Sequence, residues 1–360
     1  MAEISQRNLS LHNASRIKAP LGSNATAIRL SHELYIASWA GVGITSLACV
    51  LNLAILVVFY RGPRRLINPF SIHVINMTII NLLYAAINDP FALANLLHRE
   101  AYYGNKYFCG AYNFFQWTLQ ISMPGHQQLI ICFDRWLALL VPVWYRTKTV
   151  KFGMTATLIS LAYTLAWYLP IFITDITYTE TMVIAYPMRY CTYIKTLMGY
   201  QLVARFALTY VPRTLLVVLT PGLLYMVWKR RRKVLSTIAP SFTNSLVSNT
   251  ASGNIRMASL VRNRRPPVQR NLKAERERRF RAELWLVLWL MGMQIGCWIS
   301  TTVPSVLMQQ YVGVAVQEYI DSYSFALILS MLLLIAEPIA YVVFLKDLRA
   351  EIRSYFRCFR

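Results

Sequence analysis

An acidic and a basic residue, Asp134 and Arg135, stand side by side and are followed by Trp136, near the end of a long apolar segment. Ionisable side chains within a segment of this kind are costly, so they are seldom kept without a role. In one state the carboxylate of Asp134 can neutralise the guanidinium of Arg135. In another state the guanidinium would be released from the carboxylate, and its charged N–H groups would be exposed to a partner. The pair predicts a two-state switch. The alternative is a polar pair that only anchors the end of a helix.

Seven apolar segments position these residues. A lipid core about 30 Å thick requires about 20 residues of helix, and seven segments meet this length. The predicted spans are 34–60, 69–97, 108–140, 152–176, 199–228, 283–310 and 318–345. Their apolar runs are continuous and do not alternate at every second residue, which favours helices over a membrane barrel. We therefore expect an all-α, seven-transmembrane helix bundle.

The composition agrees with membrane residence. Of the 360 residues, 56% are hydrophobic and only 14% are charged, whereas soluble domains average about 45–50% apolar and about 25% charged residues. The net charge of +22 would also suit nucleic-acid binding. The basic residues lie at the ends of the predicted spans, however, where anionic lipids attract them. We expect a lipid bilayer as partner and no nucleic acid.

The positive charges also orient the chain. Most of the 37 Lys and Arg residues fall in the first, third and fifth connections and in the C-terminal tail. Positive residues stay on the cytoplasmic side, so the N-terminus is expected outside the cell and the C-terminus inside. The N-terminal segment carries three glycosylation sequons, at Asn8, Asn13 and Asn24. A single sequon can occur by chance, but three in this segment agree with the orientation. The expected location is the plasma membrane.

Three regions follow from this topology. They are an extracellular glycosylated N-terminus (1–33), the seven-helix domain (34–345), and an amphipathic eighth helix with a short cytoplasmic tail (346–360). The third cytoplasmic connection, 229–282, is long and basic. Its middle, 236–259, is rich in Ser, Thr and Asn and is expected to be disordered. Its end, 273–281, has dense charge and no helix breaker, so we expect it to extend the sixth helix.

The cysteines differ in their predicted surroundings. Four of the six lie within spans or in the cytoplasmic tail: Cys49, Cys132, Cys297 and Cys358. Only Cys109 and Cys191 face an oxidising compartment, so the topology permits one disulfide, between these two. The alternative is a pair of free thiols. Cys358 follows an amphipathic stretch and is a candidate for palmitoylation, and a plain free cysteine fits equally well.

These motifs resemble those of rhodopsin-like (class A) G-protein-coupled receptors. Asp134-Arg135-Trp136 is similar to the Asp-Arg-Tyr signature, and Glu337-Pro338-Ile339-Ala340-Tyr341 resembles Asn-Pro-x-x-Tyr. The resemblance covers nearly the whole chain, and its strength is the order of the matches along the seven spans. The further matches are Asn52, Asn81-Leu82-Leu83, Pro90-Phe91, the Cys109 and Cys191 pair, Pro212, Cys297-Trp298 and Lys346-Asp347-Leu348-Arg349.

The resemblance implies a receptor that binds an extracellular ligand in the bundle and activates a heterotrimeric G protein. Arg135 would engage the C-terminal helix of the G protein when the sixth helix swings outward. Trp298 would lie at the floor of the ligand pocket, although a packing or lipid-facing aromatic fits as well. Pro338 would kink the seventh helix so that Tyr341 turns inward.

Several positions depart from the family pattern. Asn81 stands where the family usually has an aspartate, and Glu337 replaces an asparagine. The family's sodium site is therefore not expected in its usual form, while Asn52 and Asn81 remain core polar candidates. The stretch from Cys109 to Arg135 is one residue longer than usual, and Pro124-Gly125 interrupts it. A local bulge in the third helix would absorb the extra residue.

The residue types narrow the ligand. Gln116 or Trp117 occupies the third-helix position at which amine receptors carry an aspartate, and the predicted seventh span lacks the lysine of retinal-binding members. The aromatic and acidic composition of the outer half suits a small peptide with an arginine and an amidated aromatic end. The fifth span loosely resembles that of invertebrate neuropeptide receptors of the FMRFamide type. A lipid or other non-amine small molecule is the alternative. The pocket candidates are Asp89, Gln116, Trp117, Gln120, Trp298, Gln309 and Tyr323.

Two other classes of function are less compatible with the sequence. A seven-helix transporter or channel is the second hypothesis, but transporters usually contain internal repeats and paired broken helices, which we do not find in the two halves of this chain. An enzyme with a metal site is a third. The histidines do not form a convergent metal set, and no helical His-Glu-x-x-His occurs. We expect no enzymatic activity, no metal and no cofactor.

Overall fold

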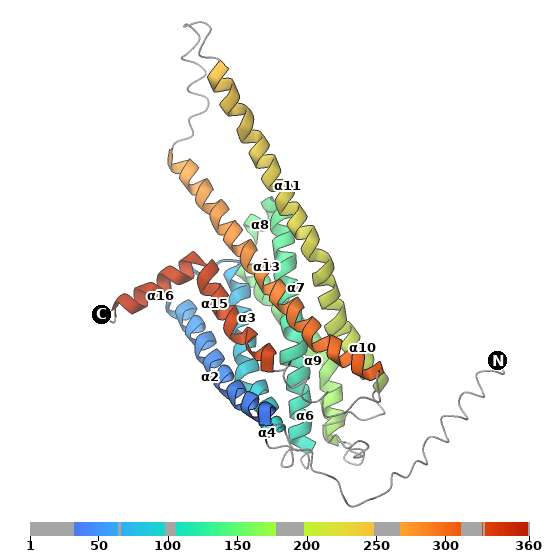
Figure 1. Ribbon diagram of the computed structural model, residues 1–360. Helices are drawn as coiled ribbons and strands as arrows, with labels where there is room; N and C mark the ends of the chain where they lie inside the picture. Colours follow the sequence, from blue (N-terminus) through green and yellow to red (C-terminus); the bar gives the residue numbers. More distant parts are fainter. Residues whose placement is uncertain are drawn as a thin grey trace, which may run out of the picture.

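The computed structural model describes residues 32–63, 66–97, 106–177, 198–247, 267–310, 326 and 328–358. Within these residues the regular secondary structure is helical and contains no strand. The helices run side by side as a bundle, and one short helix leaves it at an angle (Figure 1). The predicted all-α class and the seven-transmembrane bundle are confirmed.

The described helices follow the predicted spans closely, and three spans contain a π-helical turn, labelled η. Their bounds are α2 (His32–Arg61); α3 (Ser71–Leu83), η3 (Tyr84–Asn88) and α4 (Asp89–Leu97); α6 (Lys106–Phe115), η4 (Gln116–Ser122) and α7 (Met123–Leu140); α8 (Pro142–Thr147); α9 (Val150–Thr177); α10 (Met198–Arg205), η6 (Phe206–Tyr210) and α11 (Val211–Val247); α13 (Pro267–Gln310); α15 (Leu333–Phe344); and α16 (Lys346–Cys358). The start of the predicted seventh span lies outside the described residues.

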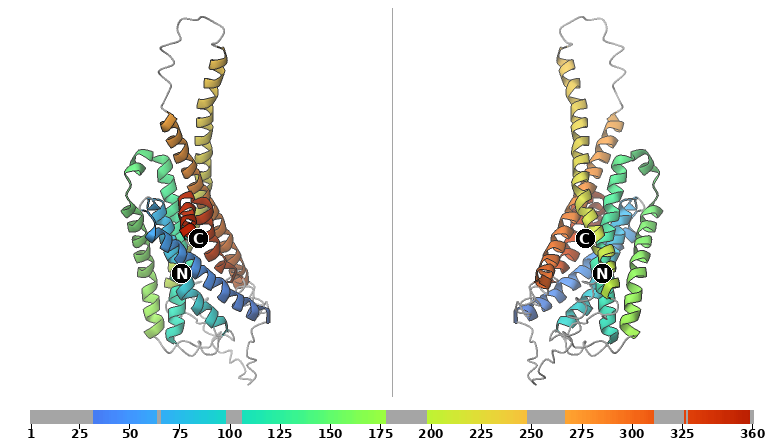
Figure 2. Two further views of the ribbon diagram at one scale, coloured as in Figure 1. Left: turned by 90° about the vertical axis from the view of Figure 1, so that its left-hand side faces the viewer. Right: turned by 90° about the vertical axis from the view of Figure 1, so that its right-hand side faces the viewer.

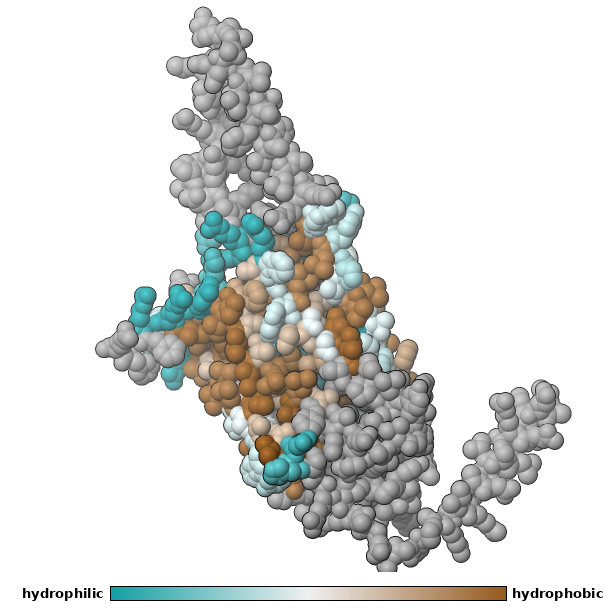
Figure 3. Space-filling model, viewed as in Figure 1, coloured by the Kyte–Doolittle hydropathy of each residue, from teal (hydrophilic) through white to brown (hydrophobic). Residues whose placement is uncertain are grey.

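The described helices fit a bilayer. Five are long and apolar enough to cross a membrane: His32–Arg61, Ser71–Ala94, Val150–Thr174, Gly199–Lys229 and Arg278–Ile299. The stretch 106–140 is more polar because it contains amide side chains and a proline. Apolar side chains form a broad band on the surface of the described bundle, with hydrophilic residues toward its two ends (Figure 3).

The helix α16 matches the predicted eighth helix. It follows the seventh span after a bend of 96° and points away from the bundle (Figure 1). Leu348 is buried, and Ile352 and Tyr355 pack against the core, whereas Arg353 and Arg357 are exposed. This distribution gives the helix one apolar and one basic side, as expected for a helix at a membrane surface.

Two long helices project beyond the others at the end of the bundle that bears α16 (Figure 2). α13 begins at Pro267, so the predicted extension of the sixth helix through 273–281 is confirmed. α11 continues past the predicted span end at 228 to Val247. The expected disorder is therefore wrong for 236–247: Ser, Thr and Asn disfavour a helix only weakly, and the helix continues through Pro240. Residues 248–259 lie outside the described residues.

The largest apolar cluster closes the α16 end of the bundle. It joins buried residues of six helices, namely α2, α3, α7, α11, α13 and α15, to α16 and to the α2–α3 connection: Ile55, Phe59, Leu66, Phe70, Val74, Ile131, Leu216, Leu286, Leu290, Tyr341 and Leu348 among others. Because these helices interlock around one core, a movement of α13 requires the cluster to repack.

Candidate functional site

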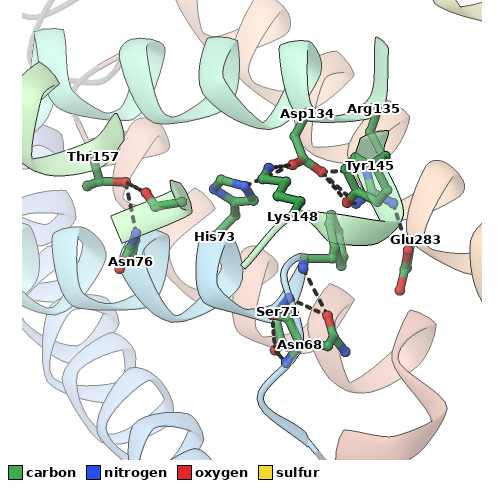
Figure 4. A network of polar contacts seen from close by, with 12 residues as sticks. Asn68, Ser71, His73, Asn76, Asp134, Arg135, Tyr145, Lys148, Thr157 and Glu283 are labelled. Atoms are coloured by element: carbon green, nitrogen blue, oxygen red, sulfur yellow. Dashed lines mark hydrogen bonds and ion pairs between the residues drawn. The ribbon is translucent and has the colours of Figure 1, made fainter. Parts of the chain in front are cut away.

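Asp134 and Arg135 lie near the end of α7, and both side chains are only 1% exposed. The guanidinium of Arg135 donates from Nη2 and Nε to Oδ2 of Asp134, at 2.6 and 3.1 Å (Figure 4). The acid therefore neutralises the neighbouring base in this conformation.

Three further groups surround the Asp134 carboxylate (Figure 4). The hydroxyl of Tyr145 donates to Oδ2 at 2.8 Å, His73 Nε2 lies 3.3 Å from Oδ1, and Lys148 donates to Oδ1. Burial raises the pKa of the Tyr145 phenol, so it keeps its proton and can donate. Asp134 thus holds together the ends of α3 and α7, the short helix α8 and the turn that follows it.

Glu283 on α13 holds the other side of Arg135. Its Oε2 accepts a hydrogen bond from Nη1 of Arg135 at 2.6 Å, and its side chain is 21% exposed. The ring of Phe70 lies 4.2 Å from the guanidinium carbon. Arg135 therefore joins α7 to α13, and its cationic fork is already occupied.

The sequence predicts Asp134 and Arg135 but not their partners. Glu283 and Lys148 stand at the boundaries of predicted spans, where charged residues are common, so their positions alone do not single them out. His73 carries a usable signal, because ionisable residues inside an apolar segment are uncommon.

Trp136, the third residue of the motif, points to a different helix. Its Nε1 donates to the carbonyl oxygen of Leu219 on α11, at 3.3 Å. Gly222 on α11 leaves room for the indole, since a Cβ at Gly222 would lie 2.7 Å from Cζ2 of Trp136. Close approach through small residues is a common way for membrane helices to pack. Trp136 therefore fixes the contact between α7 and α11.

A second polar cluster surrounds Glu337, whose side chain is buried in α15. Its Oε2 accepts hydrogen bonds from Asn81 Nδ2 at 2.6 Å and from the Tyr341 hydroxyl at 3.3 Å. Asn52 donates to the carbonyl oxygen of Leu334, at 3.0 Å. The two positions at which the sequence departs from the family pattern, Asn81 and Glu337, are thus direct partners. The family pattern has the acid in the second helix and the amide in the seventh, whereas this chain has the amide Asn81 in the second and the acid Glu337 in the seventh.

Asp89 and Gln120, two of the predicted pocket residues, lie in one region at the other half of the bundle. Asp89 is buried at the start of α4, and its Oδ2 accepts from the Thr45 hydroxyl at 3.1 Å. Its Oδ1 has no hydrogen-bond partner among the described residues. The neighbouring Asn88 donates to Oε1 of Gln120 at 3.2 Å. This contact links the second span to η4.

The other described candidates lie elsewhere in the bundle. Trp117 packs beside Tyr168 of α9, with the two ring centroids 6.3 Å apart, and Gln116 is buried next to it in η4. Trp298 lies on α13, with its ring centroid 6.4 Å from that of Tyr210. The guanidinium carbon of Arg213 lies 6.0 Å from the same indole. The predicted pocket residues therefore form two groups. Asp89 and Gln120 lie beside the second span, and Trp298 lies beside the fifth span.

The predicted bulge in the third helix is confirmed. η4 is a π-helical segment of seven residues, and Pro124 stands in the first turn of the α-helix that follows. A π-bulge accommodates one additional residue, as the long spacing from Cys109 to Arg135 requires. Proline has no N–H to continue the α-helical pattern. The π-helical turns η3 and η6 in the second and fifth spans were not predicted.

Other predicted sites fall outside the described residues. Among them are Asn8, Asn13, Asn24, Cys191 and Tyr323. Cys109, Gln309 and Cys358 belong to α6, α13 and α16, but their side chains lie outside the description. The disulfide, the glycosylation and the palmitoylation therefore stay predictions. Cys49, Cys132 and Cys297, which were predicted within spans, form no disulfide within the described residues.

The comparison with protein families gives a match over most of the chain. The family described as 7 transmembrane receptor (rhodopsin family) matches residues 51–341, from the first span to the end of the Glu337–Tyr341 motif. No curated protein matches the chain significantly. The matched range includes Asp134, Arg135 and Glu283.

Proposed function

We propose that this chain, which belongs to the rhodopsin family of seven-transmembrane receptors, binds an extracellular ligand in its bundle and activates a heterotrimeric G protein. The family consists of signalling receptors and not of enzymes, and its members are multi-pass proteins of the plasma membrane. The observation that supports the coupling proposal is that Arg135 donates hydrogen bonds to two carboxylates, Asp134 on its own helix and Glu283 on α13.

The proposed orientation puts the α16 end of the bundle in the cytoplasm and the N-terminus outside. The basic run at the inner end of the fifth span, 229–233, and the basic side of α16 lie at this end. Both would face anionic lipids of the inner leaflet. In this orientation Cys109 and Cys191 would form an extracellular disulfide, Asn8, Asn13 and Asn24 would carry glycans, and Cys358 would be palmitoylated on the cytoplasmic side.

The described conformation corresponds, in this proposal, to the resting state. Outward movement of α13 would carry Glu283 away from Arg135 and open a cavity at the cytoplasmic end. The guanidinium would then be available to the G protein, which is a two-state switch of the kind predicted. Pro338 lies inside α15 and frees a backbone carbonyl, so it would serve as a hinge beside Tyr341. Trp298, which lies on α13, would contact the ligand and transmit its binding to this helix.

A small peptide is the proposed ligand class. Asp89 supports it, because one oxygen of this buried carboxylate has no hydrogen-bond partner among the described residues. A buried carboxylate of this kind needs a donor, and a cationic group of the ligand, such as an arginine side chain or a free amino group, would supply one. A lipid or another non-amine small molecule is the alternative ligand.

A library screen tests the proposal. Cells that express the chain with a promiscuous Gα subunit and a G-protein sensor are exposed to a peptide library, and each active peptide is retested on Arg135→Ala. We expect this variant to lose the response while its surface level, measured with an N-terminal tag, stays near wild type. The matched control is Arg61→Ala, at the exposed end of α2. A full response from Arg135→Ala, or a ligand-driven current or flux without any G protein, would overturn the proposal.

A further inference from the structure

The helix α13 carries two charged residues, one turn apart, that bind different parts of the bundle. Glu283 accepts a hydrogen bond from Arg135 on α7. Arg279, four positions earlier, pairs through Nη1 with Oδ2 of Asp347 on α16, at 3.1 Å. Residues four apart lie on the same side of a helix, and Arg279, Glu283 and Asp347 line one cleft. Two successive turns of α13 are therefore attached to the α16 end of the bundle.

The position of Asp347 is fixed because the start of α16 is anchored. α16 begins directly after the bend of 96° that ends the seventh span, and the backbone N–H of Arg349 donates to the carbonyl oxygen of Leu345 at 3.0 Å. Leu348, the residue after Asp347, is 1% exposed and belongs to the core cluster of the bundle. α16 also contacts α2, the first span. The Asp347 carboxylate thus connects α13 to the first and seventh spans.

Arg279 binds two carboxylates, and only one of them lies on another helix. Its Nη2 pairs with Oε1 of Glu275 at 2.9 Å, within α13, so this contact moves together with the helix. The pair with Asp347 joins α13 to α16, so it must break when α13 moves away from α16. The side chains of Arg279 and Asp347 are 51% and 43% exposed. Water therefore weakens the pair, and exposed pairs of this kind change an equilibrium by no more than about five-fold.

We propose that Asp347 is a positioning residue for the resting state, and that it holds α13 against α16 through Arg279. The inference rests on the proposed receptor function, in which α13 moves outward during activation. It adds the eighth helix to the elements that control this movement. The pair of Glu283 with Arg135 and the pair of Arg279 with Asp347 share no residue, so their effects on the equilibrium should multiply.

Charge reversal and its rescue test this inference. Cells that express the full chain with a G-protein sensor are assayed for ligand-free activation, divided by the number of receptors at the surface. We expect Asp347→Arg and Arg279→Asp each to raise this activation about two- to five-fold, because two like charges then face each other. The double variant restores the ion pair with its charges exchanged, so it should return to the wild-type level.

The matched control is Glu351→Arg. It makes the same change of charge one turn later on α16, where the described residues form no ion pair with α13. We expect this variant to keep the wild-type level of ligand-free activation. A rise equal to that of Asp347→Arg would overturn the inference, because the charge of α16 as a whole would then account for the effect.

A role of Asp347 within its own helix gives a different result. An acidic residue in the first turn of α16 also stabilises the start of this helix, because it faces the positive end of the helix dipole. This role does not depend on the residue at position 279. Asp347→Arg would then have the same effect beside Arg279 or beside an aspartate at this position. The inference is wrong if the double variant stays as active as Asp347→Arg, or if neither single variant raises activation.

Neutral variants keep the test decisive if the reversed charges prevent surface expression. Asp347→Asn and Arg279→Gln should each raise ligand-free activation, and their combination should raise it no further, since both remove the same ion pair. Effects that multiply would contradict the inference. Glu283→Gln separates this result from a failure of the receptor proposal. If Glu283→Gln raises activation while the Asp347 variants do not, α16 does not hold α13 and the receptor function stands. If none of these variants raises activation, the proposed resting state is wrong as well.

Discussion

Replacing Glu283 by glutamine tests whether the bond between α7 and α13 holds the receptor in its resting state. The change keeps the size of the side chain and an amide oxygen that can accept, but it removes the charge opposite Arg135. The bond is short, at 2.6 Å, and Arg135 is 1% exposed, which strengthens it. Glu283 is 21% exposed, so water can partly replace it. Hydrogen bonds to charged groups contribute about 1.5–3 kcal/mol, and partial exposure favours the lower part of this range.

This energy corresponds to a measurable shift between the two states. A loss of about 1.5–3 kcal/mol changes an equilibrium constant about 10- to 100-fold. If about 1% of the wild-type receptors are open without ligand, about 10–50% of the variant would be open, with the lower value expected for glutamine. Asp134 and Tyr145 still hold Arg135 in the variant, so the fold should be retained.

The assay is ligand-free G-protein activation, divided by the number of receptors at the cell surface. The matched control is Glu275→Gln, which makes the same chemical change on the same helix. Glu275 pairs with Arg279 at 2.9 Å, but both side chains are more than half exposed, and pairs of this kind contribute about 0–1 kcal/mol. We expect Glu283→Gln to raise basal activation and Glu275→Gln to leave it unchanged. Equal basal activation in wild type and Glu283→Gln, or an equal rise in both variants, would refute the reasoning.

Two further predictions concern stability, measured as thermal unfolding of the purified protein in detergent. Gly222→Ala should lower the midpoint, because its Cβ would lie 2.7 Å from the Trp136 ring, whereas Gly292→Ala, with nothing within 4 Å of its Cβ, should be neutral or stabilising. Glu337→Gln should be tolerated, because an amide oxygen can still accept from Asn81 without a buried charge. Asn81→Leu should destabilise the protein by about 1–3 kcal/mol, since Glu337 loses this donor. Equal stability of Glu337→Gln and Asn81→Leu would contradict this role of the Asn81–Glu337 hydrogen bond.

The spans could be predicted from the sequence because each depends on residues that are neighbours along the chain. Continuous apolar runs give the helices, and the charged boundaries give their ends within a few residues. The bulge in the third helix was also accessible, because an extra residue and Pro124 both disturb one local hydrogen-bond pattern. The continuation of α11 to Val247 was missed, since a polar composition was read as disorder although it is compatible with a helix.

The partners within the site could not be predicted in the same way. Glu283 is 148 positions from Arg135, and Glu337 is 256 positions from Asn81. Which face of each helix meets which neighbour depends on rotation and depth of the helices, and a small rotation would put another residue opposite. Arg213 was visible as a basic residue within a span, but its role depends on a carbonyl of η4 that only the three-dimensional packing brings near.

The π-helical segment η4 connects the two regions for which function is proposed. Three neighbouring spans contact it: Asn88 donates to Gln120, Arg213 donates to the carbonyl of Ile121, and Ser122 shares a hydrogen bond with Tyr168 at 3.0 Å. Helix α7 continues directly from η4 and carries Asp134 and Arg135 near its other end. Because three spans are hydrogen-bonded to η4 and α7 continues from it, we expect a shift of the outer parts of these spans to reach Arg135 through this segment.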